Sequence, residues 1–362
     1  MNALLHEMRH NPILWLLICV PAVFVLKNLA PEAHTLQFFL SVAAIIPLAT
    51  LLSHATESVA AKTGDMIGGL LNATLGNLTE LVIALTALRQ GMIELVKASI
   101  TGAVVTNTLF MLGGSFFLGG LKHRTQEFNR ATARMQTGLL LLGTIALLVP
   151  SAISSVDEPG RVTFTQQLSV GLSLLLMVTY ALSLLFSLKT HREYFGSAGG
   201  EAVEEEEPWP MGVALGTLAV VTVFIALISE IFVESVQEAA IALGMTPAFV
   251  GFIVVSLVGA AAEMASAFSA ARKNRLDLSV GIAMGSSAQI ALFVAPVLLL
   301  LSYALAPAPM DLRFGPGQVV MVFLSTITVS MVVSSGRSAW YLGVQLLAVY
   351  LVFAITLYLL PQ

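Results

Sequence analysis

The sequence predicts an all-α, polytopic membrane protein with about eleven transmembrane helices. Of its 362 residues, 57% are hydrophobic and only 10% are charged, and the mean hydropathy is +0.89. A water-soluble chain of this length would carry far more charge on its surface. One crossing takes roughly 30–35 residues with its connection, so about ten or eleven helices use up the chain and leave no room for a large soluble domain.

Long apolar stretches give the expected positions of these helices. They lie at residues 12–30, 36–56, 66–90, 95–119, 134–150, 164–189, 211–232, 246–271, 278–305, 317–336 and 338–360. The first stretch is long enough to cross and has no small-residue cleavage site after it, so we expect a retained helix. Stretches such as 138–150 are apolar all round, which argues against the alternating strands of a membrane β-barrel.

The distribution of basic residues predicts the orientation in the membrane. The loop between the fourth and fifth stretches contains Lys122, Arg124 and Arg130 against the single acid Glu127. Basic loops stay in the cytoplasm, so this loop and every second connection are expected inside, with the N-terminus cytoplasmic and the C-terminus outside. Topology thereby accounts for the basic loops, and nucleic-acid binding has no support.

A hydrophilic segment divides the chain near its middle. Residues 197–208 read S-A-G-G-E-A-V-E-E-E-E-P, a composition typical of a solvated linker. We therefore expect an N-terminal transmembrane helix over 1–31, a first five-helix repeat over 32–193, an acidic cytoplasmic linker over 194–209 and a second five-helix repeat over 210–362. A regulatory or cation-sensing role of the linker is left open.

The two halves match each other without a gap. At a constant offset of 183 residues, the difference between 263 and 80, Glu80 falls on Glu263 and Arg89 on Arg272. Glycines match in the same frame: Gly68 with Gly251, Gly76 with Gly259, and Gly102 with Gly285. The matched spans are five helices apart, an odd number, so the second copy is upside down. Inverted repeats of this kind are typical of secondary transporters.

Glu80 and Glu263 are expected near the middle of the bilayer. Each lies nine residues before the basic residue that ends its span, which is about 13–14 Å along a helix. Half of the hydrocarbon core is about 15 Å thick. A charged carboxylate there costs roughly 2.5–3.5 kcal/mol, and no Lys or Arg lies at the same depth to offset it. A bound cation or bound protons are therefore expected to compensate the pair.

Oxygen-bearing side chains flank the two glutamates. Asn77 lies one turn before Glu80, and the fourth and ninth spans contribute Asn107, Ser286, Ser287 and Gln289. Hard oxygen ligands together with two carboxylates suit Ca²⁺. These residues are our candidate metal ligands, and Glu80 and Glu263 are also the candidate proton-coupling groups.

Three further acids are candidates for a gate or a vestibule. Glu57 follows the second span and is expected at the inner entrance. Glu230 and Glu234 are four residues apart and share one helix face near the outer end of the seventh span. This face is either an outer cation vestibule or an ordinary interfacial surface.

Two motifs make a resemblance to a known family specific. G-N-L-T-E at 76–80 precedes A-L-T-A-L-R-Q-G, and G-x-x-x-E at 259–263 precedes G-S-S-A-Q-I-A-L-F-V-A-P at 285–296. They resemble the repeat signatures of the calcium/cation:proton exchanger (CAX) family, within the calcium/cation antiporter superfamily, and the resemblance covers nearly the whole chain.

The resemblance implies export of Ca²⁺ in exchange for H⁺ by alternating access, with both ions competing for the paired glutamates. Ca²⁺ is then the transported ion, and no cofactor is required. The chain is expected to be embedded in the lipid bilayer. The family and the short tails imply the plasma membrane of a prokaryote. The oligomeric state, a homo-oligomer included, is left open.

The second motif departs from the family's usual G-N-A-A-E-H. Ala260 and Met264 stand where Asn and His are usual, which bears on cation preference and on pH dependence. Na⁺/Ca²⁺ or Na⁺(K⁺)/H⁺ exchange therefore stays an alternative, with a cation channel as a remote one. The spans contain no H-E-x-x-H or G-x-S-x-G motif, which argues against an intramembrane enzyme.

Overall fold

The computed structural model describes residues 11–153, 161–191 and 208–360. In these ranges nine helices are long and apolar enough to cross a membrane, and Pro247–Gly259 with Ala261–Arg272 forms a bent tenth span. The expected span at 66–90 is occupied by two short helices that follow each other. The sequence-based prediction of an all-α polytopic bundle is confirmed.

In its described residues, the first half contains one 3₁₀ segment, two π-helical segments and eight α-helices. In chain order they are η1 (Pro12–Ile18), α2 (Cys19–Leu29), α3 (His34–Lys62), α4 (Asp65–Leu75), α5 (Leu78–Arg89), α6 (Ile93–Val105), η2 (Thr106–Met111), α7 (Leu112–His123), α8 (Arg130–Ile153), α9 (Arg161–Leu185) and η3 (Phe186–Thr190).

The second half is built in the same way. Its elements are α10 (Met211–Ala242), α11 (Pro247–Phe249), η5 (Val250–Val255), α12 (Ser256–Gly259), α13 (Ala261–Arg272), α14 (Leu276–Gln289), η6 (Ile290–Val294), α15 (Ala295–Leu305), α16 (Pro316–Val333) and α17 (Trp340–Leu359). The π-helical segments η2 and η6 lie at nearly equivalent positions of the two repeats.

Two helices extend well beyond their predicted spans. The second span was expected to end at residue 56 and the seventh at residue 232, whereas α3 continues to Lys62 and α10 to Ala242. Hydropathy reports where apolar sequence ends, but a helix continues as long as its backbone hydrogen bonds and packing do. α3 packs along α10, which supports the extra turns of both helices.

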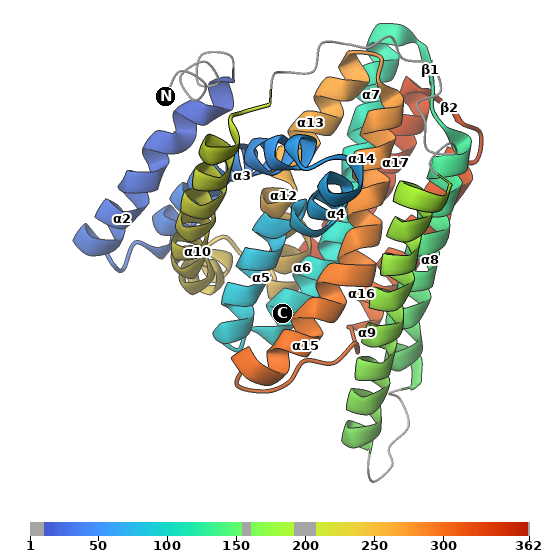
Figure 1. Ribbon diagram of the computed structural model, residues 1–362. Helices are drawn as coiled ribbons and strands as arrows, with labels where there is room; N and C mark the ends of the chain where they lie inside the picture. Colours follow the sequence, from blue (N-terminus) through green and yellow to red (C-terminus); the bar gives the residue numbers. More distant parts are fainter. Residues whose placement is uncertain (1–10, 154–160, 192–207, 361–362) are drawn as a thin grey trace.

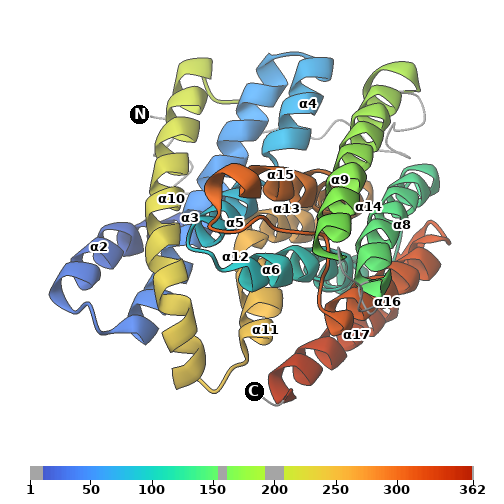
Figure 2. The ribbon, with the colours of Figure 1, turned by 90° about the horizontal axis from the view of Figure 1, so that it is seen from below.

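Two groups of helices flank a central core. Figure 1 shows α2, α3 and α10 on one side and α8, α9, α16 and α17 on the other. The view from below places α5, α6, α12, α13 and α15 between them (Figure 2). The core therefore consists of the repeat helices that were expected to carry the site.

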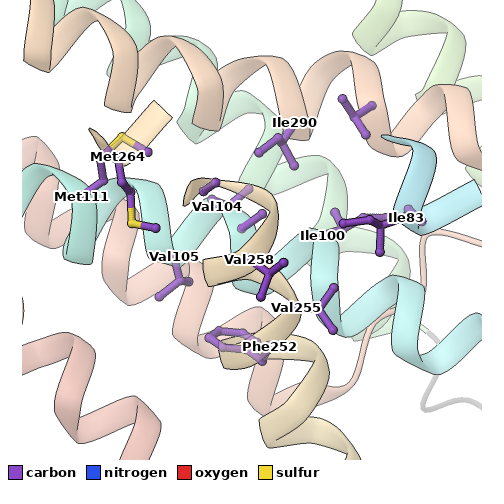
Figure 3. Packing of buried hydrophobic residues seen from close by; sticks show 14 of the residues in the cluster. Ile83, Ile100, Val104, Val105, Met111, Phe252, Val255, Val258, Met264 and Ile290 are labelled. Atoms are coloured by element: carbon purple, nitrogen blue, oxygen red, sulfur yellow. The ribbon is translucent and has the colours of Figure 1, made fainter. Parts of the chain in front are cut away.

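Glycine permits the close crossing at the centre of this core. A Cβ atom on Gly102 of α6 would lie 2.0 Å from the carbonyl oxygen of Phe252 in η5. Its absence lets the two backbones touch, as small residues do in many membrane helix pairs. Ile100, Val104 and Val255 fill the space around the crossing (Figure 3).

A short ribbon joins two loops at one end of the bundle. β1 (Thr125–Glu127) pairs antiparallel with β2 (Arg337–Ala339), and an Arg337–Glu127 ion pair of 2.8 Å spans it. The hydropathy pattern did not indicate these strands, because three residues are too few to show a period. The ribbon lies at the end that carries the basic loop, which is the expected cytoplasmic end.

An ion pair and three serines fix the loop 306–315 at the opposite end. The Nζ atom of the buried Lys97 lies 2.6 Å from Oδ1 of Asp311 and donates to the carbonyl oxygen of Arg313 at 2.8 Å. Three backbone N–H groups of the loop donate to serine hydroxyls of three helices: Met310 to Ser302, Leu312 to Ser169, and Phe314 to Ser151.

Candidate functional site

Both predicted glutamates lie directly after a break in a membrane helix. α4 ends at Leu75 and α5 begins at Leu78, while α12 ends at Gly259 and α13 begins at Ala261 after a bend of 60°. Glu80 is the third residue of α5 and Glu263 is the third residue of α13. The N-terminal end of a helix carries partial positive charge, so both carboxylates occupy places that favour an anion.

α5 and α13 extend from the middle of the bundle toward opposite ends. In Figure 1, α13 occupies the upper half of the core and α5 the lower half, with α12 near the middle. The two first turns, and with them the two glutamates, therefore meet in the interior. That the two glutamates share one ion stays a prediction.

The Glu80 side chain lies against the break of the other repeat. A Cβ atom at Gly259 would be 2.7 Å from Cγ of Glu80 and 3.3 Å from its Oε1. Glu80 also lines a cavity of only about 20 Å³, together with Ser99 and Ser256. Its Oε1 atom is buried and has no hydrogen-bond partner among the described residues. We call this space the small cavity; it has room for about one water molecule.

Glu263 faces a much larger space, which we call the large cavity. This cavity measures about 410 Å³ and is also lined by Glu57, Asn72 and Gln289. The Glu263 carboxyl group contacts Ser286 and is subject to the charges of Glu80 and Glu57. Its Oε2 atom is buried without a hydrogen-bond partner in the described part of the chain. The two glutamates thus border two different spaces.

A hydrogen-bonded triad centres on Ser286. The Ser286 hydroxyl donates to Oδ1 of Asn77 at 2.7 Å, and the Asn107 amide donates to the Ser286 hydroxyl at 3.0 Å. All three side chains are buried. The triad joins the α4–α5 break to η2 and α14, so three of the predicted ligands are brought together next to Glu263.

Gln289 lines the large cavity, whereas its repeat counterpart, Thr106, lies outside it and contacts Tyr350. Oε1 of Gln289 lies 3.5 Å from the place of a Cβ atom at Gly76, and its Nε2 has no partner among the described residues. The counterpart Thr106 lies 3.3 Å from the Tyr350 hydroxyl, within hydrogen-bond distance. The two halves therefore differ at this point although their backbones correspond.

Four other predicted residues have distinct positions. Glu57 lines the large cavity and accepts a hydrogen bond of 3.1 Å from Ser53. Ser287 is buried and donates to the Ala283 carbonyl oxygen of its own helix at 2.7 Å, and it lines neither cavity. Glu230 and Glu234 are exposed on α10 and also lie outside both cavities. Lys27 of α2 pairs with Glu234 at 2.9 Å.

The two departures from the family motif are both buried. Ala260 forms the α12–α13 break, at the place that Asn77 occupies in the first half. Met264 lies beside Met111 in a thioether and aliphatic environment (Figure 3). The break beside Glu263 therefore lacks the amide that the break beside Glu80 has.

Several polar residues that line the large cavity were not predicted from the sequence. Gln136 of α8, Ser183 of α9 and Ser266 of α13 all line it. A Gln inside an otherwise apolar span is a signal that a polar lining exists, but hydropathy does not show which face of the helix turns inward. No cluster of three His, Cys, Asp or Glu side chains occurs in the described ranges, so a cation here needs amide and hydroxyl ligands as well.

Comparison with known proteins identifies the class to which this fold and site belong. The family described as sodium/calcium exchanger protein matches residues 33–189 and 213–359. The chain therefore belongs to this family and, within it, to the calcium/cation:proton exchangers.

Particular relatives agree with this assignment over most of the chain. A Ca(2+)/H(+) antiporter of Synechocystis sp. is 40% identical over 343 residues, covering 91% of this chain and 92% of the relative. The Ca(2+)/H(+) antiporter ChaA of Bacillus subtilis is 42% identical over 318 residues, covering 87% and 90%.

Solved structures show the same architecture. Native YfkE superposes with a TM-score of 0.83 at 35% identity, covering 97% of this chain and all of that one. The H+/Ca2+ exchanger CAX gives a TM-score of 0.73 at 16% identity, covering 97% of this chain and 88% of that one, which shows a shared fold.

Proposed function

We propose that this chain exports Ca²⁺ in exchange for H⁺, with Glu80 and Glu263 binding either Ca²⁺ or protons. Relatives named Ca(2+)/H(+) antiporter, at 40% and 42% identity over most of both chains, support the exchange. Ca²⁺ and H⁺ are the transported ions, and no resident cofactor takes part.

One observation supports the glutamate pair most strongly. Two repeat-related carboxylates begin two broken helices in the protein interior, and each has a buried oxygen atom without a partner among the described residues. A buried polar atom without a partner is costly, and a buried charge is more costly still. A divalent cation between the two carboxylates compensates both charges, and protons do so in its absence.

The neighbouring amides and hydroxyl complete a Ca²⁺ ligand set. Ca²⁺ takes six to eight oxygen ligands, which include carboxylates and amide carbonyls. Asn77, Asn107, Ser286 and Gln289 lie around the pair and are the supporting ligands. Ser287, which was also expected to be a ligand, donates to the Ala283 carbonyl oxygen of its own helix, α14.

Exchange follows from competition at this single site. A carboxyl group that takes up a proton loses its charge and its attraction for the cation, so protons that arrive on one side displace Ca²⁺ that was bound from the other. The large cavity connects Glu263 with the end of α3 that carries Glu57, the expected cytoplasmic end. The small cavity on the Glu80 side measures only about 20 Å³. This conformation is the one that receives Ca²⁺ from the cytoplasm.

The wider organisation follows the sequence-based expectations. We place an N-terminal helix at 1–31 and inverted repeats at 32–193 and 210–362, joined by the cytoplasmic linker 194–209, which lies mostly outside the described residues. The N-terminus is cytoplasmic, and the membrane is the plasma membrane of a prokaryote.

Transport in proteoliposomes tests this function. An imposed pH gradient is expected to drive Ca²⁺ uptake by the parent, and Glu80→Gln and Glu263→Gln are each expected to abolish it. Na⁺ and K⁺ gradients without a pH gradient are the controls. Uptake that requires a Na⁺ or K⁺ gradient would contradict Ca²⁺/H⁺ exchange, and uptake that survives both substitutions would contradict the glutamate site.

A further inference from the structure

A glutamine outside the paired motifs enters the large cavity. Gln136 is carried by α8, while the candidate metal ligands chosen from the sequence lie on the third, fourth, eighth and ninth spans. It lines the large cavity together with Glu263, Ser286 and Gln289. The cavity wall therefore includes a carboxamide from a helix that no signature motif marks.

The carboxamide of Gln136 lies against α14 at the level of the site. Its Nε2 atom is 3.3 Å from the place where a Cβ atom at Gly285 would be. Gly285 directly precedes Ser286, whose hydroxyl contacts the Glu263 carboxyl group. The absence of a side chain at residue 285 thus lets Gln136 approach the Glu263 side of the site.

The Gln136 oxygen has no protein partner in the described part of the chain. Its Oε1 atom is buried and accepts no hydrogen bond there. Buried carboxamide oxygens are nearly always paired with protein, water or a ligand, so this one, beside a carboxylate-lined cavity, is free to accept a ligand there. Oxygen atoms of Glu80, Asn107 and Glu263 are unpaired in the same way.

Gln136 also has a counterpart in the second repeat. With a shift of one residue from the repeat frame, Gln136 of α8 corresponds to Gln318 of α16, and Thr144 corresponds to Thr326. The two threonine hydroxyls lie 3.0 Å apart, so the corresponding helices face each other directly. α8 packs on α14, and α16 packs on α6, which is the repeat counterpart of α14.

The two glutamines border different sides of the bundle. Gln136 lines the large cavity, whereas Gln318 lies near the beginning of α16, beside the loop 306–315, and lines neither cavity. Oε1 of Gln318 is likewise buried without a partner among the described residues. Gln318 therefore has the same kind of unpaired carboxamide oxygen as Gln136 but lies away from both cavities.

We propose that Gln136 is a Ca²⁺ ligand for the ion that Glu263 holds on the large-cavity side. Gln136 supplies there the carboxamide oxygen that Ala260 lacks and that Asn77 gives to the first half. Ca²⁺ accepts glutamine carbonyl oxygens among its ligands. The proposal rests on the proposed function, because it presumes Ca²⁺ transport through the glutamate pair.

Sidedness provides the test. Ca²⁺/H⁺ exchange is measured at increasing Ca²⁺ concentration in inside-out and right-side-out membrane vesicles of the parent, Gln136→Leu, Gln318→Leu and Met135→Leu. Met135 lines the large cavity next to Gln136 but offers no oxygen, so its substitution is the matched control. Gln136→Asn keeps the carboxamide and covers the case in which Gln136→Leu does not fold.

The expected result is a change of KM on one face only. Gln136→Leu raises the KM for Ca²⁺ offered from the large-cavity face roughly tenfold, the loss expected for one neutral ligand, and leaves the KM from the other face unchanged. Gln136→Asn raises the KM less than Gln136→Leu does. Gln318→Leu, which removes a carboxamide that lines neither cavity, and Met135→Leu both match the parent.

Two results would overturn the proposal. One is a folded Gln136→Leu, or a folded Gln136→Asn where only that variant can be obtained, with the parental KM on both faces. The other is a KM for Ca²⁺ that rises equally on both faces in Gln136→Leu, which would indicate a structural role of Gln136. Absence of Ca²⁺/H⁺ exchange in the parent would instead contradict the proposed function, so the two failures are distinguishable.

Discussion

Substitution of Gly259 by Ala is expected to displace the Glu80 carboxylate from its place. The added Cβ atom would lie 2.7 Å from Cγ, 3.2 Å from Cδ and 3.3 Å from Oε1 of Glu80. Carbon atoms in contact are normally about 3.5–4.0 Å apart, so the side chain must retreat by about 1 Å. A misplacement of this size lowers the efficiency of a positioned reacting group by up to about 100-fold. We therefore expect a large loss of transport at low Ca²⁺ from a single methyl group.

The assay is the initial rate of pH-gradient-driven Ca²⁺ uptake into proteoliposomes, measured over a range of Ca²⁺ concentrations. Gly171→Ala is the matched control, because a Cβ atom on Gly171 of α9 meets nothing within 4 Å. That variant should transport like the parent and gain about 0.5–1 kcal/mol of stability from the better helix former. A Gly259→Ala protein with the parental KM and rate would refute the reasoning that the Glu80 side chain is positioned by this contact.

Three further predictions concern the supports of the site and its proton coupling. Lys97→Met leaves Asp311 without its partner and should lower the free energy of unfolding by about 3 kcal/mol, seen as a lower Tm in detergent, while Lys97→Met with Asp311→Leu should recover much of this loss. Equal Tm values of Lys97→Met and the parent would contradict this role. Ser286→Ala removes the centre of the triad. It should lower the free energy of unfolding by about 1–3 kcal/mol and raise the KM for Ca²⁺. Ser325→Ala, which loses only a bond within α16, is its control, and an unchanged KM in Ser286→Ala would count against the triad. The KM for Ca²⁺ should rise as the pH on the Ca²⁺ side falls, because protons compete for the same carboxylates, and pH-independent KM values would exclude this competition.

Much of the fold could be predicted because the bilayer restricts the choices. Hydropathy and length indicated the spans, and the matched Gly, Glu and Arg residues of the sequence predicted an inverted repeat. The helix breaks at Asn77 and Ala260 were harder to predict from the sequence, because no helix-breaking Pro marks them. They form where the paired helices meet, which is a property of packing rather than of local sequence.

The composition of the site was only partly predictable, for a related reason. Glu80, Glu263, Asn77, Asn107 and Ser286 carry polar atoms in apolar spans, and they lie in the interior of the bundle. Their role as ligands stays a prediction. Gln136 carries the same signal but lies outside the aligned motifs. Hydropathy cannot show that α8 turns this residue inward.

Ion pairs between residues far apart in the chain could not be predicted from the sequence. Lys97 pairs with Asp311, which lies 214 residues later in a loop between two spans. Glu234 was expected either at an outer vestibule or at an interfacial face, and it pairs with Lys27 of α2 on an exposed surface. Such pairings depend on which helix ends become neighbours, and this is decided by the assembly of the whole bundle.

Competition between Ca²⁺ and protons at Glu80 and Glu263 is the central claim, and proton release on Ca²⁺ binding tests it most directly. Ca²⁺ is added to weakly buffered, detergent-solubilised protein, and the released protons are counted beside the bound Ca²⁺ for the parent and for the double variant Glu80→Gln/Glu263→Gln. We predict that the parent releases protons as it binds Ca²⁺, because the ligands must give them up, and that the double variant neither binds Ca²⁺ nor releases protons. Ca²⁺ binding by the parent without proton release, or unchanged binding by the double variant, would contradict the claim.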